Sequence, residues 1–286
     1  MHINSNGVET QKDEVNIFFT DKEKKQVLDD FINLSGIDIK KKYDLTEGRD
    51  WKIKTAKEDL IKNNIRIHQI QYRPFDYRFT NYTGKTKGIM AYPRFEVFQN
   101  FINNNLALCM MRQYASNDFS FCLISKTIID NRTFYSNRGK VNSFPLYLYP
   151  ENNAQQTLED QQERTPNLNK EIVNKIASGL GLTFVSESSG SASLSFNLSA
   201  AAERRGTEGE VAFTPIDLLD YIYAVLHSPT YREKYKEFLK IDFPRVPYPK
   251  DKKTFWQLVK LGGQLRQIHL LESETVNKFI TTFPID

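Results

Sequence analysis

The sequence predicts an α+β fold, with a strand-rich middle flanked by helices and a helical C-terminal subdomain. Three observations lead to this prediction. Helix-capping patterns precede apolar residues at helical spacing near the N-terminus. Alternating and strand-like apolar segments dominate residues 65–150, and helical spacing returns after residue 213. The 286 residues suffice for one large domain or two modest ones.

The N-terminal section is predicted to hold one strand followed by a capped helix. Residues 15–19 are a short run of mostly β-branched and aromatic side chains, which favours a strand. Thr20 and Glu23 have the spacing of a capping box. The helix that follows is expected to end at Gly36, because glycine commonly terminates helices.

A second capping pattern precedes the strand-rich middle. Thr55 with Glu58 predicts the start of a short helix, and Trp51 just before it is expected in the core. Residues 65–72 then alternate apolar and polar side chains, which predicts a half-buried strand. Residues 82–88 are expected to form a loop that carries two lysines between glycines.

The rest of the middle section is predicted as one helix and several buried strands. Residues 94–104 place their apolar side chains at helical spacing. Apolar runs predict strands over residues 106–112, 119–125, 127–129 and 144–150. Polar, basic turns are expected between these strands, over residues 131–133 and 136–140.

Composition changes twice after residue 150. Residues 151–163 and 186–212 are rich in Gln, Ser, Ala, Gly and Glu, which is typical of a linker or an exposed loop. A short helix is expected between them, from residue 168 to 177. We therefore predict an α+β domain over 1–150 with its strand-rich core at 65–150, a linker over 151–212, and a helical subdomain over 213–286.

The C-terminal subdomain shows three helix-start signals. Thr214 and Ser228 each precede a proline, and Asp251 opens a long apolar-periodic stretch. That stretch contains Gly262 and Gly263, and each glycine inside a helix costs about 1 kcal/mol relative to alanine. Close approach of another backbone is the expected reason for their presence.

Positive charge is concentrated in residues 71–150. This segment holds ten Lys/Arg against four Asp/Glu, a charge of +6, whereas the whole chain carries only +4. It also holds 17 of the 36 aromatic side chains, so the cations are carried by a packed body. Concentrated positive charge on a folded body is typical of proteins that bind polyanions, and we expect nucleic acid as the ligand.

Ten residues of this segment are predicted DNA contacts. Lysines and arginines in loops can reach phosphates or a groove. An arginine followed by a glutamine after a buried strand suits readout of guanine and adenine in the major groove. For the two arginines that flank Pro74, a structural ion pair with Asp76 is as well supported as a phosphate contact. The ten residues are Arg73, Arg78, Lys85, Lys87, Arg94, Arg112, Gln113, Arg132, Arg138 and Lys140.

Motifs for catalysis are missing from the sequence. It contains no glycine-rich phosphate loop, nucleophile elbow, zinc-protease motif, adenine-methylating motif or S-adenosylmethionine loop. Asp76 and Asp130 could be drawn as a metal pair, but we favour ion pairs of these acids with Arg73 or Arg78 and with Arg132. The four histidines show no metal-ligand spacing. We therefore expect no independent enzymatic activity and no cofactor in this chain.

The compartment expected from the sequence is the cytoplasm. No run of 18 apolar residues is present, so no membrane span is expected, and the N-terminus lacks the pattern of a signal peptide. The two cysteines, Cys109 and Cys122, lie in apolar stretches and are expected to be buried free thiols.

Several ordered phrases occur along nearly the whole chain, apart from residues 186–212. They include Ser5-Asn6-Gly7-Val8-Glu9, Tyr72-Arg73-Pro74-Phe75-Asp76-Tyr77-Arg78, Pro93-Arg94, Arg112-Gln113, Ile129-Asp130, Phe144-Pro145-Leu146-Tyr147, Asp220-Tyr221-Ile222-Tyr223 and Phe243-Pro244-Arg245-Val246-Pro247. In this order the phrases resemble the C-terminal specificity region of Type ISP and related Type IIG-like restriction–modification DNA adenine methyltransferases.

The resemblance implies a division of labour. In this family, the specificity region follows an adenine methyltransferase domain, which binds S-adenosylmethionine and flips out the target base. The specificity region reads double-stranded DNA. The resemblance therefore implies that this chain recognises a DNA sequence and that the methyltransferase domain of its parent protein is its partner. Two alternatives stay open from the sequence: a stand-alone metal-dependent DNA-processing enzyme using Asp76, Asp130 or Glu96, and a protein-docking module built on the apolar C-terminal helices.

Overall fold

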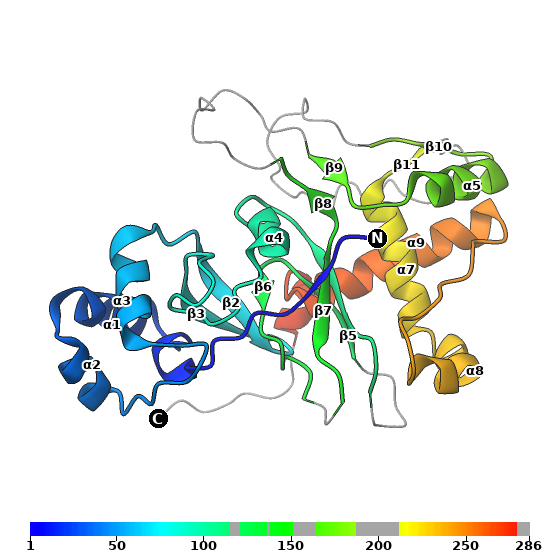
Figure 1. Cartoon of the computed structure of the whole chain (residues 1–286). Helices are drawn as coiled ribbons and strands as arrows, with labels where there is room; N and C mark the ends of the chain where they lie inside the picture. The colour runs from blue at the N-terminus through cyan, green and yellow to red at the C-terminus, as the bar shows by residue number, and fades with distance from the viewer. Residues whose placement is uncertain (115–120, 136–137, 151–163, 187–211, 279–286) are drawn as a thin grey trace. The chain divides into compact units, whose positions relative to one another are not determined.

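The computed structural model describes residues 1–114, 121–135, 138–150, 164–186 and 212–278 (Figure 1). The chain divides into two compact units. Residues 3–115 and 125–145 carry 23 basic and 16 acidic side chains, a charge of +7, and are called the basic unit. Residues 1–2, 116–124 and 146–286 carry 16 basic and 19 acidic side chains, a charge of −3, and are called the acidic unit.

Three helices occupy the N-terminal part of the basic unit: α1 (Asp21–Asn33), α2 (Gly36–Lys42) and α3 (Ile53–Lys62). The predicted capping box is confirmed, because Thr20 Oγ1 accepts from Glu23 N and the Glu23 carboxylate accepts from Thr20 N. The predicted helix end at Gly36 is wrong. The first helix stops at Asn33, and Ser35 caps a new helix by accepting from Asp38 N.

Two other local predictions in this part are wrong. Residues 15–19 form no strand: Asp13–Val15 is a 3-10 turn, η1, and only Phe18 pairs with a strand residue, Phe79. Helix α3 begins at Ile53, so Thr55 is not its cap, and its hydroxyl donates to Lys52 O within the first turn. Trp51 is buried as predicted, and its Nε1 donates to Ile89 O at 2.9 Å.

A three-stranded sheet has the order β3-β2-β6. The antiparallel strands β2 (Ile67–Arg73) and β3 (Asp76–Tyr82) form a hairpin, and β6 (Ile128–Ile129) runs parallel to β2. The pairing of Arg73 with Asp76 leaves Pro74 and Phe75 as the turn. Phe75 has φ +62°, a left-handed conformation that costs a residue with a side chain about 1–2 kcal/mol.

A second set of paired strands lies in the same unit. Strand β7 (Val141–Pro145) pairs antiparallel with both β1 (Ser5–Asn6) and β4 (Ala107–Met111). Strand β4 confirms the strand predicted over 106–112. Strand β5 (Cys122–Ser125), of which residues 122–124 belong to the acidic unit, confirms the described part of the run predicted over 119–125. The apolar run 144–150 is divided, because β7 ends at Pro145 and β8 covers only Tyr147–Leu148.

The helix predicted over 94–104 is shorter than expected. It consists of α4 (Phe95–Phe98) and the 3-10 turn η2 (Gln99–Phe101). Asparagine side chains replace the next helical hydrogen bonds: Asn100 Nδ2 donates to Val97 O at 2.8 Å and Asn105 Nδ2 donates to Asn100 O at 3.0 Å. Such local amide bonds compete with helix continuation.

The acidic unit contains the remaining elements. Strands β8 and β9 (Thr165–Pro166) are antiparallel, and β10 (Thr183–Phe184) and β11 (Ala212–Phe213) are parallel. The helices are α5 (Lys170–Leu180), α7 (Pro215–His227), α8 (Pro229–Leu239) and α9 (Lys252–His269), followed by the 3-10 turn η3 (Glu274–Asn277). The predicted start signals at Thr214, Ser228 and Asp251 are confirmed. Most of the predicted linker lies outside the described residues.

Helices α7 and α9 cross at very short range (Figure 1). A Cβ on Gly262 would lie 1.9 Å from Asp220 O, so only glycine permits this contact. The backbone approach predicted from Gly262 and Gly263 is confirmed, and it occurs inside this chain. The glycines therefore no longer support a protein-docking surface. Beside them, Arg266 forms a buried, two-pronged ion pair with Asp220, at 2.6 and 3.0 Å.

The cysteines match the prediction. Cys109 and Cys122 are buried thiols that form no disulfide, and burial raises the pKa of the Cys109 thiol to about 12. In the described ranges, none of the helices combines the length and apolar character needed to span a membrane.

Candidate nucleic-acid interface

All ten predicted contact residues belong to the basic unit, the unit with the +7 charge. Five of them form ion pairs with nearby carboxylates, and the side chains of Lys85, Arg112, Gln113, Arg132 and Arg138 are exposed. The ion-paired members are Arg73, Arg78, Lys87, Arg94 and Lys140. A DNA contact of each of the ten residues stays a prediction.

The N-terminal segment holds several of these residues together. Gly7 N donates to Val141 O at 3.0 Å, Val8 N donates to Ile129 O at 2.8 Å, and Asn131 N donates to Val8 O at 2.9 Å. A Cβ on Gly7 would lie 2.6 Å from Asn131 N, so a larger residue would push the segment away. The turns that carry Arg132 and Lys140 therefore meet around residues 5–9.

Glu9 is the charged centre of this arrangement. Its Oε1 lies 2.5 Å from Lys140 Nζ and 3.3 Å from Arg94 Nη2, and its backbone pairs with Tyr92. Burial raises the pKa of Glu9, but the hydrogen bond and charge of Lys140 and the charge of Arg94 outweigh it and lower this pKa below 4.5. One carboxylate between two cations leaves this cluster with a charge of +1. Sequence reasoning missed Glu9, because its partners lie far along the chain.

The turn at Gly139 brings Arg112 and Gln113, the residues predicted to read bases, close to the turn that carries Arg138 and Lys140. Met111 pairs with Val141 at the end of the β4–β7 ladder. Residues 112–113, which follow β4, and residues 138–140, which precede β7, therefore lie at the same end of this ladder. A Cβ on Gly139, at φ +75°, would lie 2.5 Å from Gln113 O. Arg112, Gln113 and Arg138 are exposed at this end. This geometry suits contact with a groove and its phosphates.

The lysine loop, residues 83–89, is held by a buried carboxylate from α3. Asp59 Oδ2 accepts from Thr83 Oγ1 at 2.9 Å and from Ile89 N at 2.8 Å. A Cβ on Gly88 would lie 2.0 Å from the same oxygen, so the loop packs directly onto it. Lys87 pairs with Asp50 at 3.0 Å, whereas Lys85 is exposed and forms no ion pair within the described ranges. The loop thus presents Lys85 from a fixed backbone.

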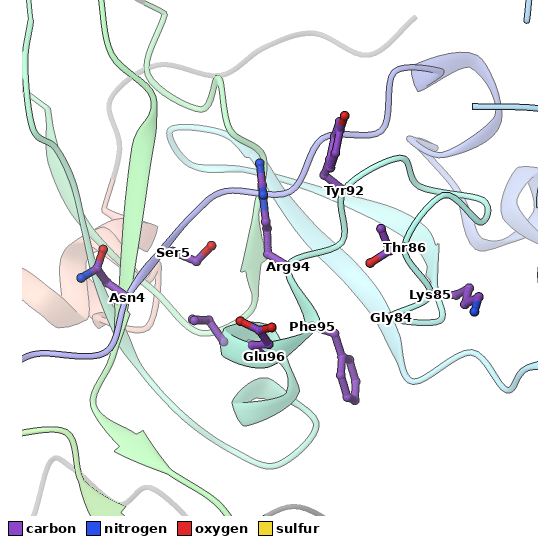
Figure 2. Close-up of a pocket in the computed structure, with 10 residues that line it drawn as sticks. Asn4, Ser5, Gly84, Lys85, Thr86, Tyr92, Arg94, Phe95 and Glu96 are labelled. Atoms are coloured by element: carbon purple, nitrogen blue, oxygen red, sulfur yellow. The ribbon is translucent and has the colours of Figure 1, made fainter. Parts of the chain in front are cut away.

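An open pocket of about 550 Å³ lies between this loop, β1 and the start of α4 (Figure 2). Its lining combines hydrogen-bond donors, acceptors and aromatic rings. Two cations, Lys85 and Arg94, and one acid, Glu96, are among its residues. The lining residues are Asn4, Ser5, Gly84, Lys85, Thr86, Tyr92, Arg94, Phe95, Glu96 and Val97. Arg94 contributes a buried Nε that has no hydrogen-bond partner in the described structure. A mixed polar and aromatic lining suits a nucleotide better than an isolated anion.

Asp76 and Asp130, the two carboxylates considered as a metal pair, each form an ion pair with an arginine. Asp76 accepts two hydrogen bonds from Arg78, at 2.6 and 2.9 Å, as one of the predicted alternatives states. Asp130 pairs with Arg73 at 2.8 Å, whereas the expected partner Arg132 reaches it only through its backbone N–H. Within the described residues, no group of three or more His, Cys, Asp or Glu side chains could hold a metal ion.

Burial raises the pKa of Asp130 to about 6, although the Arg132 N–H and the Arg73 charge act against this shift. Its side chain is only 7% exposed, which accounts for the direction of the shift. The Arg73–Asp130 pair therefore joins a buried carboxylate to an arginine side chain that is 35% exposed.

Comparison with known proteins places the fold. None of the curated proteins matches this sequence. Three solved structures share the fold, and the chain spans only about a fifth of their length. They are a DrdV–DNA complex (20% identity, 94% of this chain, 23% of that chain, TM-score 0.60), the ATP-dependent Type ISP restriction–modification enzyme LlaBIII bound to DNA (21%, 93%, 15%, 0.60), and a nuclease-deletion mutant of the Type ISP enzyme LlaGI with a DNA substrate mimic (19%, 94%, 22%, 0.55).

The family model for the Type ISP C-terminal specificity domain matches residues 1–286, the whole of this sequence. The resemblance stated from sequence phrases is therefore confirmed. The chain belongs to the family of Type ISP C-terminal specificity domains.

Proposed function

We propose that this chain binds double-stranded DNA and recognises the target sequence of a restriction–modification DNA adenine methyltransferase. The observation that carries the proposal is the match of the specificity-domain family to the entire sequence. The +7 charge of the basic unit supports it independently, because charge of this size on one compact body attracts a polyanion. The three structural neighbours are DNA complexes, which agrees with the proposal.

The proposed mechanism separates phosphate contacts from base contacts. Lys85 and Arg132 present exposed cations for phosphates, while Arg112 and Gln113 present groups for base edges at the end of β4. The ion-paired cations position the loops that carry them, and the exposed lysines among them, Lys87 and Lys140, also face solvent for phosphate contacts. Adenine methylation would belong to the methyltransferase domain of the parent protein, which we propose as the partner and as the site for S-adenosylmethionine. The location proposed is the cytoplasm.

Salt dependence of binding tests the basic residues. Replacing Lys85, Lys87, Arg138 and Lys140 by alanine is expected to weaken duplex binding and to flatten the slope of log affinity against log salt by about 0.9 for each phosphate that the variant no longer binds. The matched control replaces four exposed lysines of the acidic unit, Lys175, Lys234, Lys253 and Lys260, which changes the net charge equally. An unchanged slope in the first variant, or equal slopes in both, would exclude these residues as the DNA footprint.

Incubation of the chain with duplex DNA and Mg²⁺ or Mn²⁺ addresses the metal-dependent alternative. We expect no cleavage, because Asp76 and Asp130 are both engaged by arginines. Cleavage that Asp130→Asn abolishes would replace DNA reading with DNA processing as the function.

Glu9→Gln is expected to raise duplex affinity several-fold and to steepen the salt slope, because Arg94 and Lys140 lose the carboxylate they share. Fluorescence anisotropy over a range of salt concentrations measures both effects. Glu96→Gln replaces an exposed acid of the pocket that Arg94 lines, with the same change of net charge, and as the control it is expected to leave the slope unchanged.

The same variant predicts a pH dependence of stability. Because the folded-state pKa of Glu9 is lowered below 4.5, its carboxylate stabilises the fold above that pH, and this contribution is lost as the pH falls through the folded-state value. Wild type should therefore be more stable than Glu9→Gln at neutral pH and equal to it in strong acid. A constant difference across this range would contradict the ion-pair role.

A further inference from the structure

Phe19 turns its aromatic ring to the surface of the basic unit, at a place where a helix start usually packs an apolar side chain. It directly precedes Thr20, the N-cap of α1, and an apolar residue at this position commonly packs against the fourth residue of the helix. That residue is Lys24, whose ammonium group pairs with Asp21. Phe19 is instead 74% exposed.

Hydrogen bonds hold the backbone on both sides of this ring. Phe18 N donates to Phe79 O at 3.0 Å and Phe79 N donates to Phe18 O at 2.9 Å, which ties the preceding residue to β3. Phe19 N and Thr20 N both donate to Glu23 Oε2, at 2.9 and 3.0 Å. Phe19 is therefore exposed on a fixed backbone, so little conformational entropy is lost when a ligand packs on its ring.

Arg78 covers one face of the Phe19 ring. Its guanidinium carbon lies 3.6 Å from the ring centre. Both oxygens of Asp76 hold the guanidinium, at 2.6 and 2.9 Å, and the Arg78 side chain is only 19% exposed. Arg78 is thus placed to position the ring. Because one face is covered and Phe19 is still mostly exposed, the other face is open to solvent.

A flat, open ring face with a cation behind it suits a nucleobase. The cation attracts the π electrons of the ring toward its own side, so the open face repels the π electrons of a stacked base less. Residues 20–25, which follow Phe19 along α1, are all polar, so α1 does not extend the ring into a wide apolar patch of the kind that binds protein. Among them Lys22 is exposed, forms no ion pair within the described ranges and offers a cation to a phosphate.

We propose that Phe19, positioned by Arg78, stacks on an unpaired base of DNA. A base inside a duplex is stacked on both faces, so a base face is open only in a single strand or where the base lies outside the helix. The inference rests on the proposed DNA-binding function. It adds to that function a site for one unpaired base, at a residue that is not among the ten predicted DNA contacts.

Three DNA forms test this site with the full chain: a single strand, a paired duplex, and the same duplex with one extra, unpaired thymine. We expect the single strand, the bulged duplex or both to bind wild type at least about 5-fold more tightly than Phe19→Ala, the lower end of what base–aromatic stacking contributes. The paired duplex should bind both proteins equally. Phe19→Trp should keep the affinity, and Phe19→Leu, apolar without a ring, should lose it. The form that depends on Phe19 identifies the source of the base.

Photocrosslinking gives a second readout of the same contact. In the unpaired position, 5-iodouracil replaces thymine, because irradiation joins this base to an aromatic side chain stacked on it. We expect the crosslink at Phe19, identified by mass spectrometry of the peptide. Arg78→Lys keeps the positive charge but not the flat guanidinium, and it should lower the crosslink yield. If Arg78 only supported the fold, the yield of the folded Arg78→Lys protein would equal that of wild type.

Two controls separate the site from general effects. Phe238→Ala removes another phenylalanine, 72% exposed on α8, and should bind all three forms like wild type. Phe19→Ala should melt close to wild type, because its ring is mostly exposed. If wild type binds the paired duplex but neither unpaired form depends on Phe19 and no crosslink forms there, the base site alone is overturned and the ring is left to a protein surface. A wild-type chain that binds no DNA would overturn DNA binding and the base site together.

Discussion

Arg266→Leu is expected to lower the free energy of unfolding by about 3–5 kcal/mol. The Arg266 and Asp220 side chains are 1% and 0% exposed, and their two hydrogen bonds measure 2.6 and 3.0 Å. Removing the guanidinium takes away the charge partner of a carboxylate that is buried between α7 and α9. Urea denaturation followed by far-UV circular dichroism measures the loss, and Lys260→Leu, an exposed position on the same helix, should change stability by less than about 0.5 kcal/mol.

The double variant Asp220→Leu/Arg266→Leu separates the ion pair from simple packing. Arg266 Nη1 is buried with no hydrogen-bond partner among the described residues, so the pair itself carries an uncompensated desolvation cost. Replacing both charges removes this cost, and much of the stability lost in the single variant should return. If Arg266→Leu alone loses less than about 1 kcal/mol, the buried pair does not hold the two helices together as described.

Asp59→Ala is expected to destabilise the protein by about 2–6 kcal/mol and to weaken DNA binding as well. Asp59 is 3% exposed, and its carboxylate accepts hydrogen bonds from both ends of the lysine loop, from Thr83 Oγ1 and from Ile89 N. Alanine leaves these two donors buried without an acceptor, at about 1–3 kcal/mol each. The loop then loses the support that orders Lys85, which is the reason to expect weaker binding.

Chemical denaturation and duplex binding at fixed salt test this prediction together. Glu58→Ala is the matched control, because Glu58 is the adjacent, exposed acid on α3 and its removal changes the net charge equally. It should alter stability by less than about 0.5 kcal/mol. Equal stability of the Asp59 and Glu58 variants would show that the loop does not depend on this carboxylate.

Sequence patterns identified the locally encoded elements well. The capping box at Thr20 and the helix starts at Thr214, Ser228 and Asp251 depend on residues within three or four positions, so they can be recognised from the sequence. The strand predictions over 65–72 and 106–112 succeeded because side-chain alternation or a buried apolar run is itself a local feature.

The errors occurred where partners from elsewhere in the chain decided the outcome. Residues 15–19 have strand composition, yet only Phe18 finds a partner strand residue, so no ladder forms there. The helix expected over 94–104 begins only after Arg94, whose backbone is left-handed, and asparagine side-chain amides then interrupt it. Neither the strand pairing of residues 15–19 nor the asparagine side-chain hydrogen bonds can be predicted from the spacing of apolar residues alone.

The sequence by itself determined the α+β class, the concentration of positive charge and the membership of a specificity-domain family, because composition, local patterning and ordered phrases are properties of the chain. Only the tertiary structure decided which cations stay exposed. Glu9 and Asp50 neutralise cations tens of residues away, Asp59 orders the lysine loop, and Asp130 takes Arg73 instead of Arg132. The reason is physical: an ion pair depends on distance in space, and folding sets that distance independently of separation along the sequence.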